Sequence, residues 1–258
     1  MNGKYKARLI DKTLTKYLST FGAVCVEGPK WCGKTWSCEH QAKSVFRLGD
    51  PANNFQNREL AKIDIYATLS GHKPHLIDEW QEIPEIWDAV RYKVDEVGVK
   101  GQFLLTGSST PQRKGILHSG AGRIATLKMD TLSLWEAEDS CGVVSLLDLF
   151  NGTVETKITG QMELGYIADL IVRGGWPAKF GSLNQSYSSL MPQQYIDAII
   201  SEDINRLEDK KRNINKMRIL LRSLARNEST TVSMNTLRND MANKDGSALD
   251  DETILDYN

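Results

Sequence analysis

An eight-residue segment near the amino terminus, Gly28-Pro-Lys-Trp-Cys-Gly-Lys-Thr35, limits the choice of fold more than any other stretch of the chain. Its spacing, G-x-x-x-x-G-K-[ST], is the phosphate-binding loop pattern, which joins a buried strand to a helix. The strand is indicated by the mostly apolar run at residues 21–27. The segment therefore predicts a strand, a loop and a helix that together bind the phosphates of a nucleotide.

Each residue type in this loop has a physical role. Gly28 and Gly33 let the backbone curve without Cβ clashes, so that loop N–H groups and the helix N-terminus face a polyphosphate. Lys34 can reach the β- and γ-phosphates, and Thr35 can offer its hydroxyl to Mg²⁺. An ordinary glycine turn that caps a helix is the alternative. We expect ATP to contact the loop and the first helical residues: Gly28, Pro29, Lys30, Trp31, Cys32, Gly33, Lys34, Thr35 and Trp36.

A carboxylate pair, Asp78 and Glu79, follows the apolar residues Leu76 and Ile77. A buried strand that ends in Asp-Glu is the Walker B pattern, in which Asp78 holds Mg²⁺ and Glu79 activates water as a general base. An enzyme that transfers phosphate to a bound acceptor has less use for the glutamate, so the pair disfavours a small-molecule kinase. The alternative is a strand that runs into a polar helix cap. His75, where an apolar residue is expected, predicts a short strand.

A third apolar segment begins at Gln102, and its apolar part ends in Thr106 and Ser108. In a parallel sheet the carboxyl ends of the strands line the ligand crevice. A hydroxyl there can contact the γ-phosphate or the attacking water. Thr106 is the better candidate because it directly ends the apolar run, and a plain Thr-Gly-Ser turn is the alternative.

These three segments together resemble the AAA+ superfamily. More narrowly, they resemble a prokaryotic ATPase family in which an AAA domain precedes a C-terminal domain of unknown function. The resemblance continues in Ser119-Gly-Ala-Gly-Arg123, Leu132-Ser-Leu-Trp-Glu136, Gly174-Gly-Trp-Pro177 and Glu202-Asp-Ile-Asn-Arg206. It implies ATP binding with Mg²⁺ and ATP hydrolysis.

The resemblance also implies a role for Arg123, which follows Gly-Ala-Gly and precedes an expected strand. Assemblies of this superfamily insert an arginine from a neighbouring subunit to stabilise γ-phosphate charge. Arg123 is therefore a candidate catalytic residue of a homo-oligomer. An exposed arginine with a surface ion pair is the alternative, and Arg113 and Lys114 are rivals for the role.

Strands and helices alternate through about residue 130, with further strands expected at 45–50 and 123–129 and helices at 55–69 and 83–97. This alternation predicts an α/β fold of the P-loop NTPase type, a parallel sheet sandwiched by helices. Helical patterns dominate after residue 140. We predict an ATPase domain over 1–140 and a mainly α-helical region over 141–258, with helices at 163–172, 193–207 and 213–226.

The helical region holds a basic stretch, residues 206–226, with eight basic and two acidic residues. Helices are also expected at 233–242 and from residue 250 onward, an order that resembles the start of a winged helix-turn-helix. A solvated helix face is the simpler account of this stretch, and contact with the phosphate backbone of DNA, a possible partner, is the functional one. The chain ends soon after the third helix begins, so we expect a C-terminally truncated piece of a longer protein.

Composition sets few further limits on function. Net charge is −1 over 258 residues, which gives no overall basic signal for nucleic acid. The N-terminus has no signal region, and apolar runs are too short to span a membrane. The cytoplasm is the expected compartment, and the four cysteines are expected to be free thiols.

The function that this sequence favours is an ATP-driven switch, which hydrolyses ATP in an oligomer or with a partner and releases ADP. A nucleotide-gated DNA-binding regulator with little turnover is the alternative.

Overall fold

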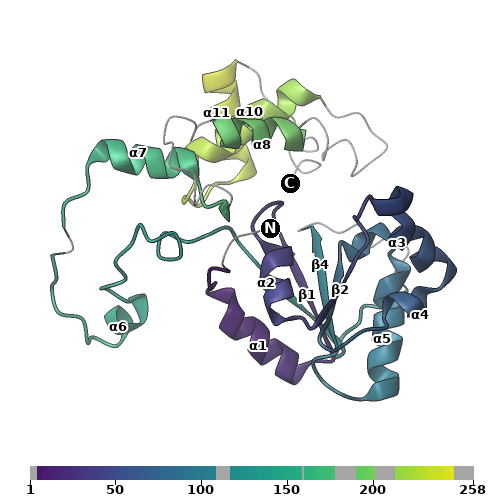
Figure 1. Ribbon diagram of the computed structural model, residues 1–258. Helices are drawn as coiled ribbons and strands as arrows, with labels where there is room; N and C mark the ends of the chain where they lie inside the picture. The colour runs from purple at the N-terminus through teal and green to yellow at the C-terminus, as the bar shows by residue number, and fades with distance from the viewer. Residues whose placement is uncertain (1–4, 109–116, 159, 178–189, 201–212, 247–258) are drawn as a thin grey trace. The chain divides into compact units, whose positions relative to one another are not determined.

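The computed structural model describes residues 5–108, 117–158, 160–177, 190–200 and 213–246 (Figure 1). Contacts divide the chain into two units, Met1–Gln185 and Ser186–Asn258, and each is described by itself. The domain boundary expected near residue 140 stays a prediction.

The first unit is built on a five-stranded parallel sheet with the strand order β2-β3-β4-β1-β5. Its strands are β1 (Ala23–Gly28), β2 (Ser44–Arg47), β3 (His75–Asp78), β4 (Phe103–Ser108) and β5 (Ile124–Lys128). All neighbouring strands pair in parallel, so their carboxyl ends share one edge of the sheet. The register sets Asp78 opposite Thr106 at that edge.

Helices cover both faces of the sheet, as predicted (Figure 1). Because side chains alternate along a strand, Val24 and Val26 pack on one face with Leu14, while Ala23 and Cys25 pack on the other with the Trp87 cluster. The first face is covered by α1 (Ile10–Thr20) and α2 (Lys34–Gln41), and the second by α3 (Ala52–Ile63), α4 (Ile65–Thr68), η1 (Trp80–Glu82) and α5 (Glu85–Val97).

Several element boundaries differ from those expected. The helix predicted at 55–69 is two helices, because Asp64 leaves the helical conformation and its carboxylate accepts the N–H groups of Tyr66 and Ala67 as the cap of α4. The helix predicted at 83–97 starts at Glu85, after Pro84, and η1 precedes it. His75 is buried in a four-residue β3, and its ring nitrogens lie 2.6 Å from Ser44 Oγ and 2.9 Å from the Thr68 carbonyl. These side-chain bonds let a polar residue occupy an apolar position.

Helices follow the sheet, as predicted. α6 (Leu146–Phe150) and α7 (Leu164–Arg173) belong to the first unit, and α8 (Leu190–Ala198), α10 (Ile214–Arg226) and α11 (Met234–Asp245) belong to the second. α10 and α11 pack through a small core of Leu220, Leu237 and Met241. The third helix expected from residue 250 lies outside the described residues, so the winged-helix assignment stays a prediction. Within the described ranges, no helix combines the length and apolar character needed to cross a membrane.

Candidate nucleotide-binding site

The phosphate loop lies between the end of β1 at Gly28 and the start of α2 at Lys34. A Cβ at Gly28 would lie 2.1 Å from the Met129 carbonyl oxygen, which forbids any larger residue. Gly33 has φ +101°, a value that side-chain-bearing residues rarely adopt. Both motif glycines are therefore required by the backbone path that turns β1 into α2.

The Lys34 side chain is buried and folds back into the loop. Its Nζ donates to the carbonyl oxygens of Gly28 at 2.8 Å and Pro29 at 2.9 Å. These two bonds hold the positive charge inside the curve of the loop. Because an ammonium group has three donors, one donor is left for a phosphate. A polyphosphate that enters this curve meets that charge at the N-terminus of α2, where the helix dipole also favours an anion.

Three predicted residues from three elements meet at one carboxylate oxygen. Thr35 Oγ1, at the start of α2, donates to Asp78 Oδ1 over 2.7 Å. Thr106 Oγ1, in β4, donates to the same oxygen over 2.5 Å. Asp78 ends β3, so the shared edge of the parallel sheet brings these three residues together.

These donors fit Mg²⁺. The ion prefers oxygen ligands and is usually held by one or two protein groups, with substrate phosphates and water completing its shell. Thr35 and Asp78 supply such oxygens beside the phosphate loop. A full protein cage is not needed, and the described residues contain no cluster of three or more His, Cys, Asp or Glu suited to a metal ion.

Glu79 follows Asp78 with a left-handed backbone, φ +59°. Its N–H donates to Thr106 Oγ1 at 3.3 Å, and its carboxylate accepts a hydrogen bond from the side-chain amide of Gln81. Burial raises the pKa of Glu79 above the ordinary glutamate value, although the Gln81 hydrogen bond opposes the shift. A carboxylate with a raised pKa is a stronger base, which suits proton abstraction from water. The sequence alone did not place Gln81 at the site.

Arg123 lies away from the phosphate loop of its own chain. It precedes β5, at the amino edge of the sheet, and its carbonyl accepts the N–H of Ala23 at the start of β1. Its half-exposed side chain forms an ion pair with Asp95 at 2.8 Å. Action in a neighbouring subunit stays a prediction, and the rivals Arg113 and Lys114 lie outside the described residues.

Two loop contacts were missed by sequence reasoning. Arg8 Nη1 donates to the Cys32 carbonyl at 2.8 Å, and the Trp176 indole N–H donates to the Lys30 carbonyl at 3.2 Å. Neither Arg8 nor Trp176 belongs to the phosphate-loop motif, and nothing in that motif's spacing indicates these two contacts. Trp176 lies in the segment 174–177, which contributed to the family resemblance.

The cysteines within the described residues form no disulfide. Burial raises the pKa of Cys32 and, more strongly, that of Cys38. The Cys32 thiol, which lies inside the phosphate loop, therefore ionises less readily than an ordinary thiol.

Acidic side chains of the second unit form ion pairs with arginines of the basic stretch 206–226. Arg218 pairs with Asp197 at 2.7 Å, and Arg226 pairs with Asp240 at 2.7 Å and with Asp245 at 2.5 Å. The remaining part of the stretch, 206–212, lies outside the described residues. The α10 arginines therefore pair with acids of their own unit.

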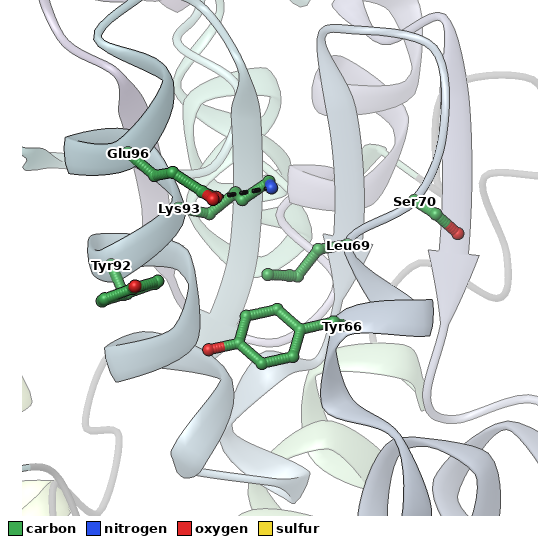
Figure 2. Close-up of a pocket in the computed structure, with 6 residues that line it drawn as sticks. All are labelled: Tyr66, Leu69, Ser70, Tyr92, Lys93 and Glu96. Atoms are coloured by element: carbon green, nitrogen blue, oxygen red, sulfur yellow. Dashed lines mark hydrogen bonds and ion pairs between the residues drawn. The ribbon is translucent and has the colours of Figure 1, made fainter.

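A separate hollow of about 410 Å³ lies between α4 and α5 (Figure 2). Tyr66 and Tyr92 face it, and Lys93 and Glu96 form an ion pair at its edge. Its lining contains no residue of the phosphate loop or of the Asp78-Glu79 pair. It is therefore distinct from the candidate nucleotide site.

Comparison with known proteins agrees with this geometry. A family model described as an AAA domain matches residues 20–138, and one described as a domain of unknown function (DUF8612) matches residues 165–257. The uncharacterized proteins Mb2031c of Mycobacterium bovis and Rv2008c of Mycobacterium tuberculosis are each 26% identical to this chain over 198 residues. The match covers 75% of this chain but 38% of each relative.

Two solved structures resemble this chain over most of its length, each with a TM-score below 0.5. The Walker-type ATPase PABY2304 of Pyrococcus abyssi has a TM-score of 0.47 and 12% identity, covering 95% of this chain and 85% of that one. A variant of Thermotoga maritima RuvB has a TM-score of 0.37 and 15% identity, with the same coverage of 95% and 85%. The family matches confirm what the motifs resembled: the chain joins an AAA domain at residues 20–138 to a C-terminal domain of unknown function at residues 165–257.

Proposed function

We propose that the chain binds ATP together with Mg²⁺, hydrolyses it to ADP and phosphate, and uses the cycle as a conformational switch. The observation that carries this proposal is the meeting of Thr35, Asp78 and Thr106 at one carboxylate oxygen, with Glu79 beside them. A loop that bound phosphate for another purpose would not need a metal-type carboxylate, a sensing hydroxyl and a base at the same edge of the sheet.

The residues divide the work of hydrolysis. Lys34 and the loop N–H groups hold the phosphates, while Thr35 and Asp78 hold Mg²⁺, which would neutralise developing charge on the phosphate oxygens. Glu79 accepts a proton from water as the water oxygen attacks the γ-phosphorus and the bond to the β-phosphate oxygen breaks. Thr106 contacts both Asp78 and the Glu79 N–H, which places it to orient these two acids relative to each other.

A first test removes the metal-binding hydroxyl. In Thr35→Ala, we expect ATP affinity to fall by about tenfold with Mg²⁺ present, the usual effect of one lost bond to a charged group. Affinity measured in EDTA should change much less, because the hydroxyl acts through the metal. Calorimetric titration under both conditions checks this, with Thr35→Ser as the control that keeps the hydroxyl. Equal losses with and without Mg²⁺ would contradict the metal assignment.

A homo-oligomer completes the proposed catalytic site. Arg123 lies at the sheet edge opposite its own phosphate loop, so it can reach a γ-phosphate only in another subunit. Arg123→Ala and Lys34→Ala should each be inactive alone, and mixing them should recover part of the ATPase rate, because mixed interfaces combine an intact loop with an intact arginine. Full activity of Arg123→Ala alone would remove this role.

The switch has a physical starting point in the segment 174–177. Trp176 donates to the Lys30 carbonyl, and the Gly175 carbonyl accepts the Leu132 N–H at 2.7 Å. A nucleotide that fills the loop would therefore change the surroundings of the segment that follows α7. Hydrogen exchange across residues 164–177 should differ between ADP and a non-hydrolysable ATP analogue, and identical exchange would argue against this coupling. The DNA-regulator alternative gains no support from the paired arginines of α10.

A further inference from the structure

Arg8 is a buried arginine whose guanidinium joins three separated parts of the first unit. Its Nε donates to Glu136 Oε1 at 2.9 Å, its Nη1 to the Cys32 carbonyl at 2.8 Å and its Nη2 to the Asp130 carbonyl at 3.0 Å. The residue is 8% exposed. The rigid planar fork of the guanidinium thus connects the phosphate loop to the segment that follows β5.

Glu136 holds this fork in place. Besides Arg8, its carboxylate accepts the Leu9 N–H, the Ser133 N–H and the Ser133 hydroxyl, each at 2.8 to 2.9 Å. Burial alone raises the pKa of Glu136, but these hydrogen bonds outweigh it and bring the pKa down to about 2. The carboxylate therefore stays charged across the working pH range, and Arg8 has one fixed anchor.

The hydrogen bond from Arg8 to the Cys32 carbonyl also affects the direction of the next backbone N–H, that of Gly33. The Cys32–Gly33 peptide is trans, since the sole cis bond recorded in the described chain joins Lys73 to Pro74. In a planar trans peptide the C=O and the following N–H point in opposite directions. An arginine that fixes the Cys32 carbonyl toward itself therefore turns the Gly33 N–H away from itself.

We propose that Arg8 is a positioning residue for phosphate binding: by anchoring the Cys32 carbonyl, it presets the Gly33 N–H to donate to a bound phosphate. This role rests on the proposed nucleotide site. Arg8 touches no phosphate itself. The simpler alternative is a buried ion pair that supports folding alone, and the two accounts differ in how ATP affinity and stability change together.

The test uses ion-pair variants measured for both properties. Arg8→Met leaves Glu136 as an unpaired buried charge, so stability should fall strongly. Adding Glu136→Gln removes that charge but keeps a side-chain acceptor for the Leu9 and Ser133 N–H groups, so it should recover part of the unfolding temperature. If Arg8 positions the loop, ATP affinity should be about tenfold below the parent in both variants, the usual effect of one lost bond to a charged group. If the pair serves folding alone, affinity should recover with stability.

Two further measurements sharpen the result. Arg8→Lys keeps the charge but lacks the fork that reaches both carbonyls, so it should also lose affinity, whereas Arg91→Lys, whose ion pairs are with Asp88 and Asp95, should not. The amide resonance of Gly33 should shift on ATP addition in the parent and much less in the double variant. A double variant that binds ATP as tightly as the parent overturns the positioning role. A parent that binds no ATP overturns the nucleotide site itself.

Discussion

Lys34→Ala is expected to lose ATP binding by about 10²–10⁴-fold, since a lysine that bonds two phosphates contributes two charged hydrogen bonds. In the structure this ammonium donates to the carbonyls of Gly28 and Pro29. Alanine therefore removes the charge that draws a polyphosphate into the curve of the loop, and it leaves those two carbonyl oxygens to repel the anion. Calorimetric titration with ATP and Mg²⁺ measures the change.

A surface lysine provides the matched control. Lys62 on α3 pairs with Glu59 one helical turn away, and both side chains are more than half exposed. Lys62→Ala removes the same charge without touching the loop, so its ATP affinity should equal that of the parent. If Lys34→Ala also bound ATP like the parent, the phosphate-loop assignment would be wrong.

Glu79→Gln is expected to bind ATP normally and to lose hydrolysis by about 10²–10⁴-fold, the usual contribution of a general base. Glutamine keeps the size of the side chain and its polar contact with Gln81, but it cannot accept the proton of the attacking water. Single-turnover release of phosphate, measured beside nucleotide affinity, separates the two effects. Unchanged turnover in this variant would show that another group activates water.

The pH profile provides an independent check on Glu79. The base works only when deprotonated, so activity falls as pH drops through its pKa. Burial raises that pKa, which moves the acid limb of the ATPase profile above about pH 4.3, the ordinary glutamate value. The residual activity of Glu79→Gln should lack this limb. A parent profile that stays flat down to the ordinary value would contradict the buried-base geometry.

The residues at the centre of the candidate site could be predicted from sequence because each lies in a short motif or at the end of a strand of a parallel sheet. The spacing between Gly28 and Thr35 fixes the loop. Asp78 and Thr106 each end an apolar run, and the parallel arrangement brings strand ends to one edge. Their convergence needed no knowledge of loop lengths, since strands of a parallel sheet all begin and end on the same sides.

The surroundings of the site could not be predicted in this way. Arg8 and Glu136 are separated by 128 positions, and no local pattern marks a lone arginine as the partner of a distant carboxylate. The break before α4 is different: Asp64 followed by Ile65 is a recognisable helix start, and the apolar spacing from 55 to 69 concealed it. Helix α1 was also overlooked, although Leu14 and Leu18 show its buried face.

The positions of α1 and Arg8 show that a domain defined by sequence similarity can be shorter than the domain that folds. Similarity to the AAA model begins at residue 20, yet Leu14 covers the face of the sheet that carries Val24 and Val26, and Arg8 ties down the Cys32 carbonyl. A piece trimmed to 20–138 would expose that face and leave the Glu136 carboxylate without its cation. We therefore expect the smallest cooperative unit that carries the candidate nucleotide site to start before Arg8. The AAA-domain match at residues 20–138 covers fewer residues than this unit needs to fold.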